Sequence, residues 1–230
     1  MKKQFLILLL IASFQGFSQP AEQPLKKTIK LGVSFSPDYS SVTTKEDDGF
    51  PNFVKDHKEA KFGYTTGVNV SWGVNHWLAL DAGLHFANKG YKSEWIDASN
   101  PQGELSEARW FDHFYYLDIP ITAKFFITKK KFSMFASLGL SPSIFLDNKY
   151  YLEVKYVSGE SKEHHTESQM DAKSGNLVML AGIGVDYAVT NRLSVRIEPV
   201  YRRSLTAING DPTKFYPWSA GANVGLYVGL

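Results

Sequence analysis

The chain has 230 residues, with 25 Lys and Arg against 23 Asp and Glu, and it contains no cysteine. The length predicts one domain, and a formal net charge of +2 is too small to indicate nucleic-acid binding or a polybasic membrane tether. Without cysteine, the chain cannot form disulfides, thiolate zinc sites, a thiol nucleophile or a cysteine-linked lipid anchor. Its 16 Phe, 12 Tyr and 18 Gly favour strands over helices.

The first 18 residues have the pattern of a secretory signal peptide. Lys2 and Lys3 give a positive start, an apolar run covers Phe5 to Ala12, and small residues precede a cleavage point after Ser18. The apolar run is far shorter than the roughly 20 residues that a spanning helix needs, which argues against an N-terminal anchor. We therefore expect a signal peptide over 1–18, a flexible lead-in over 19–27 and a folded domain over 28–230.

Apolar and polar side chains then alternate with a period of two, which is the repeat of a β-strand. In one segment Leu80 and Leu84 share a face, while Asp81 and His85 share the other. Eight segments show this alternation: about Thr28–Ser36, Lys61–Gly73, Trp77–Tyr91, Phe111–Ile127, Lys131–Leu146, Ser174–Val189, Arg192–Leu205 and Trp218–Leu230. The apolar face carries no charged residue in any of them, so it is suited to contact lipid.

The connections between these segments also alternate, between short and long. Short turns are expected at Asn75-His76, Thr128–Lys130 and Thr190-Asn191, and long polar loops over Pro37–Ala60, Lys92–Trp110, Asp147–Lys173 and Thr206–Pro217. This pattern predicts an all-β fold, an eight-stranded antiparallel up-and-down transmembrane β-barrel of a Gram-negative outer membrane. Both termini would be periplasmic and the long loops extracellular. A soluble β-sandwich or lipocalin-like barrel is the alternative, but its apolar face would point inward.

Aromatic residues on the apolar face are expected to form two girdles. The loop-end girdle would contain Tyr64, Phe86, Tyr115, Tyr201 and Trp218, and the turn-end girdle Trp72, Phe125, Phe132 and Tyr187. Between them, Ile119, Ile121, Val195 and Ile197 should face mid-bilayer, whereas Thr122 should point inward.

Three stretches resemble the PorT-like outer-membrane β-barrel family of Bacteroidetes. They are Tyr116-Leu117-Asp118-Ile119-Pro120-Ile121 with Lys124, Gly83-Leu84 followed by Lys89-Gly90-Tyr91, and Glu198-Pro199-Val200-Tyr201. The resemblance covers about Thr28 to Leu230 and implies a small barrel of the same eight-stranded kind. It also suggests an accessory role in a secretion system, because the eponymous member is linked to type IX secretion. One departure is Leu230, which stands where many outer-membrane barrels end in an aromatic residue.

An eight-stranded barrel is only wide enough for its own side chains, so the lumen should be filled. The polar faces predict a lumen charge network of Asp81, His85, Asp118, Lys124, Asp186, Arg196 and Glu198, with Lys30, Asn69 and Lys89 also pointing inward. Buried charges should pair, because an unpaired one costs several kcal/mol. The alternative interpretation is a narrow polar path with a proton-sensitive gate at His85.

Few residues suggest chemistry. Two pairs are candidates for an acid–base couple, Asp112 with His113 and Asp81 with His85. Asp112 and His113 are adjacent on a strand, so they point to opposite faces and cannot meet directly. Glu163-His164-His165 with Glu167 could suggest a metal site, and Asp47-Asp48-Gly49 is better explained as a turn than as half of a calcium loop. We therefore expect no catalytic, cofactor-binding or metal-binding residues.

The long loops carry aromatic residues that could either bind a partner or pack on one another. They are Phe50, Phe53, Trp95, Trp110, Tyr151, Tyr156, Phe215 and Tyr216. The sequence thus favours a non-enzymatic barrel for surface interaction or envelope organisation, with outer-membrane lipid and envelope or secretion proteins as partners. A small passive channel is the alternative function, and an outer-membrane enzyme the third.

Overall fold

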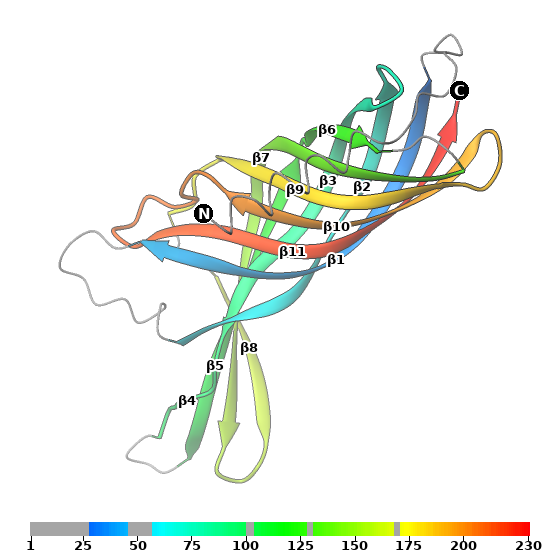
Figure 1. Ribbon diagram of the computed structural model, residues 1–230. Helices are drawn as coiled ribbons and strands as arrows, with labels where there is room; N and C mark the ends of the chain where they lie inside the picture. The colour runs from blue at the N-terminus through cyan, green and yellow to red at the C-terminus, as the bar shows by residue number, and fades with distance from the viewer. Residues whose placement is uncertain (1–27, 46–56, 100–103, 128–130, 168–170) are drawn as a thin grey trace, which may run out of the picture.

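The computed structural model describes residues 28–45, 57–99, 104–127, 131–167 and 171–230 (Figure 1). The predicted signal peptide and lead-in lie outside these residues, as do Asp47-Asp48-Gly49, Phe50 and Phe53. The strands are β1 (Ile29–Lys45), β2 (Lys58–Gly73), β3 (Leu78–Ser93), β4 (Ile96–Asp97), β5 (Leu105–Asp118), β6 (Ile121–Phe126), β7 (Phe132–Tyr156), β8 (Ser161–Glu167), β9 (Gly175–Ala188), β10 (Leu193–Ser204) and β11 (Lys214–Gly229). No helix in the described ranges is long and apolar enough to cross a membrane.

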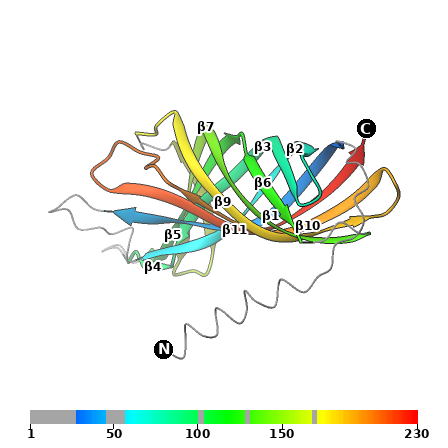
Figure 2. The ribbon, with the colours of Figure 1, turned by 45° about the horizontal axis from the view of Figure 1, so that its top comes forward.

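Strand pairing closes the sheet into a ring. β1 pairs with β2 on one side and with β11 on the other, and every pairing is antiparallel. β5 and β6 both lie between β3 and β7, so they act as one strand interrupted at Ile119-Pro120. The ring then continues through β7, β9, β10 and β11 (Figure 2). The predicted eight-stranded up-and-down barrel is confirmed.

The first strand is longer than the sequence analysis predicted, because Pro37 was taken as the start of a loop. β1 continues through Pro37 to Lys45. The β1–β11 ladder is interrupted at Ser36 and Pro37, between Phe35↔Val224 and Asp38↔Gly221, while the β1–β2 ladder pairs Pro37 with Tyr64, so the strand continues past the proline.

Two of the predicted polar loops, Lys92–Trp110 and Asp147–Lys173, are largely sheet. β4, β8, residues 105–114 of β5 and residues 149–156 of β7 form a four-stranded extension, here called the blade, which projects from the ring (Figure 1). A bulge where Tyr115 and Tyr116 face Asp147 and Phe145 shifts the register at its base. Bulges bend a strand and increase its twist. The prediction failed because the blade, unlike the barrel wall, carries charged and aromatic residues on both faces.

The barrel wall is apolar outside and polar inside. Ile121 and Leu138 expose 58% and 55% of their surface on the outside, whereas Arg196 exposes 2% inside. A contiguous apolar belt of this kind is expected to face lipid rather than water. Thr122 lines an internal cavity, so the predicted register of the fourth wall strand is confirmed.

Aromatic contacts mark both ends of the belt. At the loop end Phe86 contacts Tyr64 and Tyr115, with ring centroids 6.2 and 5.8 Å apart, and Tyr201 contacts Trp218 at 6.3 Å. At the turn end Trp77 stacks on Phe125 at 6.1 Å, with Trp72, Phe132 and Tyr187 exposed nearby in the strand register. We call the first group the loop-end girdle.

Replacing Ile121 with Arg should lower the free energy of unfolding by about 2–4 kcal/mol, because the charge would lie in the middle of the apolar belt. Leu205→Arg, at the loop end of the belt, should cost less than about 1 kcal/mol. Denaturant unfolding in lipid vesicles would measure both losses. Equal losses would contradict the proposed depth of Ile121.

Candidate functional site

The described lumen holds five basic and five acidic side chains in ion pairs. The lumen charge set comprises Lys30, Lys89, Lys124, Arg196, Arg202, Asp38, Asp81, Asp118, Asp186 and Glu198. All except Lys30 are buried. The formal charges of these ten residues cancel, so the set carries no net charge.

Arg196 on β10 joins two acids from other strands. Its Nη1 donates to Asp81 Oδ2 at 2.6 Å and its Nη2 to Asp186 Oδ2 at 3.1 Å. Lys30 Nζ also reaches Asp186 Oδ2, at 3.3 Å. The guanidinium lies over the Tyr227 ring, 4.2 Å from its centroid. Arg196 thus fixes β3, β9 and β10 in relation to one another across the lumen.

Lys124 forms the second centre of the network. Its Nζ donates to Glu198 Oε2 at 2.6 Å and lies 3.8 Å from Asp81 Oδ2, so Asp81 links it to the first centre. Ser137 donates to the other oxygen of Glu198 at 2.5 Å. Five of the seven residues in the predicted lumen charge network therefore form one connected group, together with Lys30.

Asp118 and His85 lie apart from that group. Lys89 Nζ donates to Asp118 Oδ2 at 2.6 Å, as a separate pair nearer the loop end. His85 Nε2 is 2.8 Å from Asn69 Oδ1, and the Asn69 amide donates to Ser34. His85 therefore has an amide partner, whereas the sequence had suggested Asp81.

Asp38 is a lumen residue that was not predicted, because the first strand was expected to end at Ser36. Asp38 accepts from Arg202 Nη1 at 2.8 Å, from Ser36 at 2.6 Å and from Thr65 at 2.5 Å. A Cβ at Gly221, its partner on β11, would overlap Asp38 Oδ1, so the carboxylate needs glycine there. The continuing small polar residues at 34, 36, 38 and 40 were the signal that could have found it.

The described part of the barrel contains internal cavities, of which two border the lumen charge set. The larger, of about 190 Å³, lies at the turn end and is lined by Lys30, Ser71, Phe126, Asp186 and Arg196 among others. Asp186 Oδ1 and Arg196 Nε have no hydrogen-bond partner among the described residues, and the cavity has room for several waters at roughly 30 Å³ each. The smaller, of about 30 Å³, lies deeper, between Asp81, His85 and Lys124.

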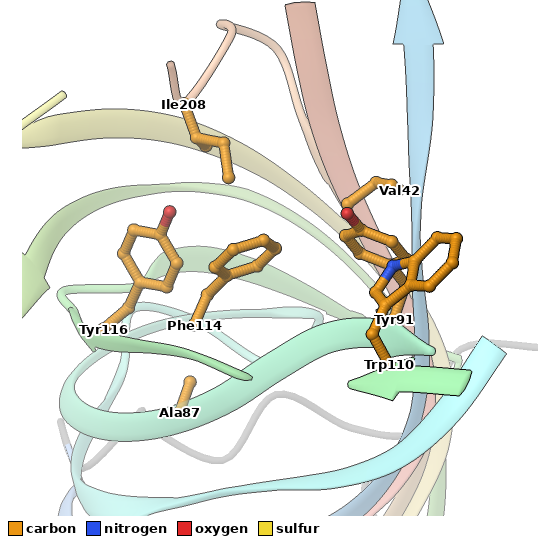
Figure 3. Packing of buried hydrophobic residues seen from close by; sticks show 7 residues of the cluster. All are labelled: Val42, Ala87, Tyr91, Trp110, Phe114, Tyr116 and Ile208. Carbon is orange, nitrogen blue, oxygen red and sulfur yellow. The ribbon is translucent and has the colours of Figure 1, made fainter. Parts of the chain in front are cut away.

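Apolar side chains fill the loop end of the lumen. The outer plug consists of Val42, Ala87, Tyr91, Trp110, Phe114, Tyr116 and Ile208, which converge from separate parts of the wall (Figure 3). Ile208 belongs to the β10–β11 connection. The backbone N–H of Lys173 donates a hydrogen bond to the Ile208 carbonyl at 2.8 Å and holds this connection in place. Trp110, predicted to be an exposed loop aromatic, is buried. Sequence reasoning missed this because the connections were read as polar loops.

Beyond the loop-end girdle, the adjacent residues Asp112 and His113 point to opposite faces and have separate partners. Asp112 accepts hydrogen bonds from Tyr91 and Asn148, and burial raises the pKa of its carboxyl to about 6. His113 Nδ1 lies 3.0 Å from Lys61 Nζ. Burial, with Lys61 and Lys149, lowers the pKa of His113 to about 4, and burial lowers the pKa of Lys61 to about 8 against the effect of Asp112.

These positions do not form the acid–base couple considered from the sequence. The described residues also contain no group of three or more side chains that could hold a metal ion, and Glu163 and His164 project to opposite sides of β8.

Removing Arg196 should leave two buried acids without their main partner. Arg196→Gln should therefore lower the free energy of unfolding by about 3–5 kcal/mol, and less if water in the larger cavity reaches Asp186. Adding Asp81→Asn should restore part of the loss. Denaturant unfolding in detergent, followed by heat-modifiable gel mobility, measures both changes. A double variant no more stable than Arg196→Gln would show that Asp81 is not the relevant partner.

Asp112 should destabilise the fold as it ionises. The pKa of its carboxyl is about 6 in the folded chain, against an ordinary value of 3.8. The protonated carboxyl therefore contributes to the free energy of unfolding in full below about pH 4, and this contribution is lost as the pH rises through about 6. The free energy of unfolding of Asp112→Asn, relative to that of the wild type, should rise by about 2 kcal/mol between pH 4 and pH 7. Paired unfolding curves would show this. Glu160→Gln, at an exposed turn, should show no such change, and an equal change there would contradict the assignment.

Similar solved structures have low identity to this chain. Neisserial surface protein A matches with 13% identity, covering 87% of this chain and 96% of that one, with a TM-score of 0.44. Outer membrane protease OmpT from Escherichia coli has 10% identity, covering 90% and 99%, with a TM-score of 0.47. Outer membrane protein OprG from Pseudomonas aeruginosa has 14% identity, covering 86% and 95%, with a TM-score of 0.38.

No curated protein sequence matches the chain. A family model for the outer membrane protein beta-barrel domain, in contrast, matches residues 17–230, which is almost the whole sequence. The chain therefore belongs to the outer membrane protein beta-barrel domain family.

Proposed function

We propose that this protein is a non-enzymatic outer-membrane barrel with a closed lumen, and that its blade and outer connections act in surface interaction or envelope organisation. The observation that carries the proposal is the balanced lumen charge set beneath the outer plug. Ten paired charges and seven apolar side chains occupy the space that a conducting pore would need.

The orientation follows from general barrel architecture. Outer-membrane barrels have short periplasmic turns and longer extracellular loops. The short turns and the C-terminus lie at one end of this barrel and the blade at the other (Figure 1). We accordingly place both termini in the periplasm and the blade outside. The resemblance to PorT-like barrels extends the proposal to an accessory role in secretion.

The geometry around His85 and His113 supports a protein without catalytic activity. A general base needs an orienting acid and a nucleophile within hydrogen-bond reach. His113 contacts the ammonium of Lys61, and His85 contacts the amide of Asn69. Neither arrangement supplies an acid to orient the imidazole.

A small passive channel is the second candidate. It is favoured by the cavity of about 190 Å³ at the turn end and the second cavity of about 30 Å³ beyond it, between charged residues. The outer plug would then be the part that closes the path.

Conductance in planar bilayers tests the choice. The wild-type protein should give no steady single-channel current, because paired charges and the outer plug fill the lumen. Phe114→Ala with Ile208→Ala, which thins the plug, should raise current only if the charged region below it is hydrated. Phe62→Ala, on the exposed outside of β2, serves as the control. Steady current from the wild type would overturn the closed barrel and favour the channel.

A further inference from the structure

A continuous line of ring contacts leads from the barrel wall onto the blade. Phe35, Tyr64, Phe86 and Tyr115 contact one another in turn across β1, β2, β3 and β5, with ring centroids 5.8–6.3 Å apart. The line then turns along β5, because His113 stacks between Tyr115 and Phe111 at 6.5 Å on either side. The outer face of the blade is therefore continuous with the lipid-facing surface.

Tyr151 and Lys149 complete this face from β7. The Tyr151 ring meets His113 edge-on at 5.4 Å, and Lys149 is the cross-strand partner of His113. Lys149 Nζ lies 5.7 Å from the centroid of the Tyr115 ring. Lys149 is exposed, and the rings of Phe111, His113, Tyr115 and Tyr151 are partly exposed. We call these five residues the rim patch.

Glycine at position 90 lets a second ammonium reach the rim patch. Gly90 has a φ of 140°, and a Cβ there would overlap the Asp112 carbonyl oxygen and lie 2.8 Å from Lys61 Cε. Lys61 therefore crosses over Gly90 to His113 Nδ1. Since His113 accepts through Nδ1, its other ring nitrogen carries the proton and is a donor.

Acids near the rim patch include Asp147, Glu153 and Glu167, the last being the cross-strand partner of Lys149 on β8. Asp147 accepts a hydrogen bond from the backbone N–H of Asn148 at 2.8 Å, and Glu153 is paired with Arg109 at 2.7 Å. Further along the blade, Lys155 is paired with Glu107 at 2.8 Å and lies over Trp95. Lys149 lies over a ring face, as Lys162 on β8 lies over the Tyr156 ring at 5.2 Å.

We propose that the rim patch binds the phosphorylated sugar headgroup of a glycolipid in the outer leaflet. Flat rings offer stacking surfaces for sugar rings, while Lys149 and the His113 N–H supply donors for a phosphate beside them. The position fits this partner, because headgroups lie immediately above an aromatic girdle. The inference rests on the proposed orientation, which puts the blade end in the outer leaflet.

The test uses the full-length protein in phosphatidylcholine nanodiscs doped with diphosphorylated lipid A. Native mass spectrometry then measures the lipid A retained per protein. Lys149→Gln should weaken retention about fivefold, the effect of about 1 kcal/mol for one lysine near an anionic headgroup. Lys149→Arg, which keeps the positive charge, should retain lipid A as well as the wild type does. Lys155→Gln, on the same face but further from the girdle, should leave retention unchanged.

Dephosphorylated lipid A separates phosphate recognition from general lipid contact. The wild type should retain it only as well as Lys149→Gln retains the phosphorylated form. Equal retention of both forms by the wild type, or equal loss in Lys149→Gln and Lys155→Gln, would overturn the proposal. Heat-modifiable gel mobility verifies that each variant is folded. The conductance experiment stays independent, because a conducting lumen would overturn the closed barrel and leave the lipid result as measured.

Discussion

A bilayer offers no hydrogen-bond partner to a strand edge, and in this chain the β1–β11 ladder meets that requirement. Once the first and last strands pair, every wall strand has two neighbours and the apolar faces must point outward to lipid. The polar faces are then forced into a space too narrow for bulk water. The lumen chemistry is therefore a consequence of closure, since inward charges are retained only where they find opposite partners.

The pairing across the lumen links distant parts of the sequence. Arg196 contacts Asp81 on β3, and Arg202 contacts Asp38 on β1, so residues more than one hundred positions apart depend on each other. Such contacts form only in the closed ring. The same pairs that stabilise the barrel also occupy its interior, and stability and closure of the lumen have one physical origin.

Much of the wall was predictable because a single period governs it. The alternation around Ile121 and Thr122 fixed which face meets lipid, and Arg196 and Glu198 were placed inside for the same reason. Their partners were not predictable, since sequence alone does not say which strands lie opposite. The blade was missed because charged and aromatic residues occur on both of its faces, so no uniformly apolar face marks its strands. Asp38 was missed because Pro37 suggested a loop.

The loop end combines features that a purely structural plug would not require. Filling the mouth needs only inward apolar groups such as Phe114 and Ile208, which the outer plug supplies. The opposite face of the same strand carries His113 between two aromatic rings, with one ammonium brought to it across Gly90 and another placed over Tyr115. Because successive residues of a strand point to opposite faces, the even-numbered residues of β5 fill the lumen and its odd-numbered residues face the membrane surface. One strand thereby serves both the closed interior and the exterior.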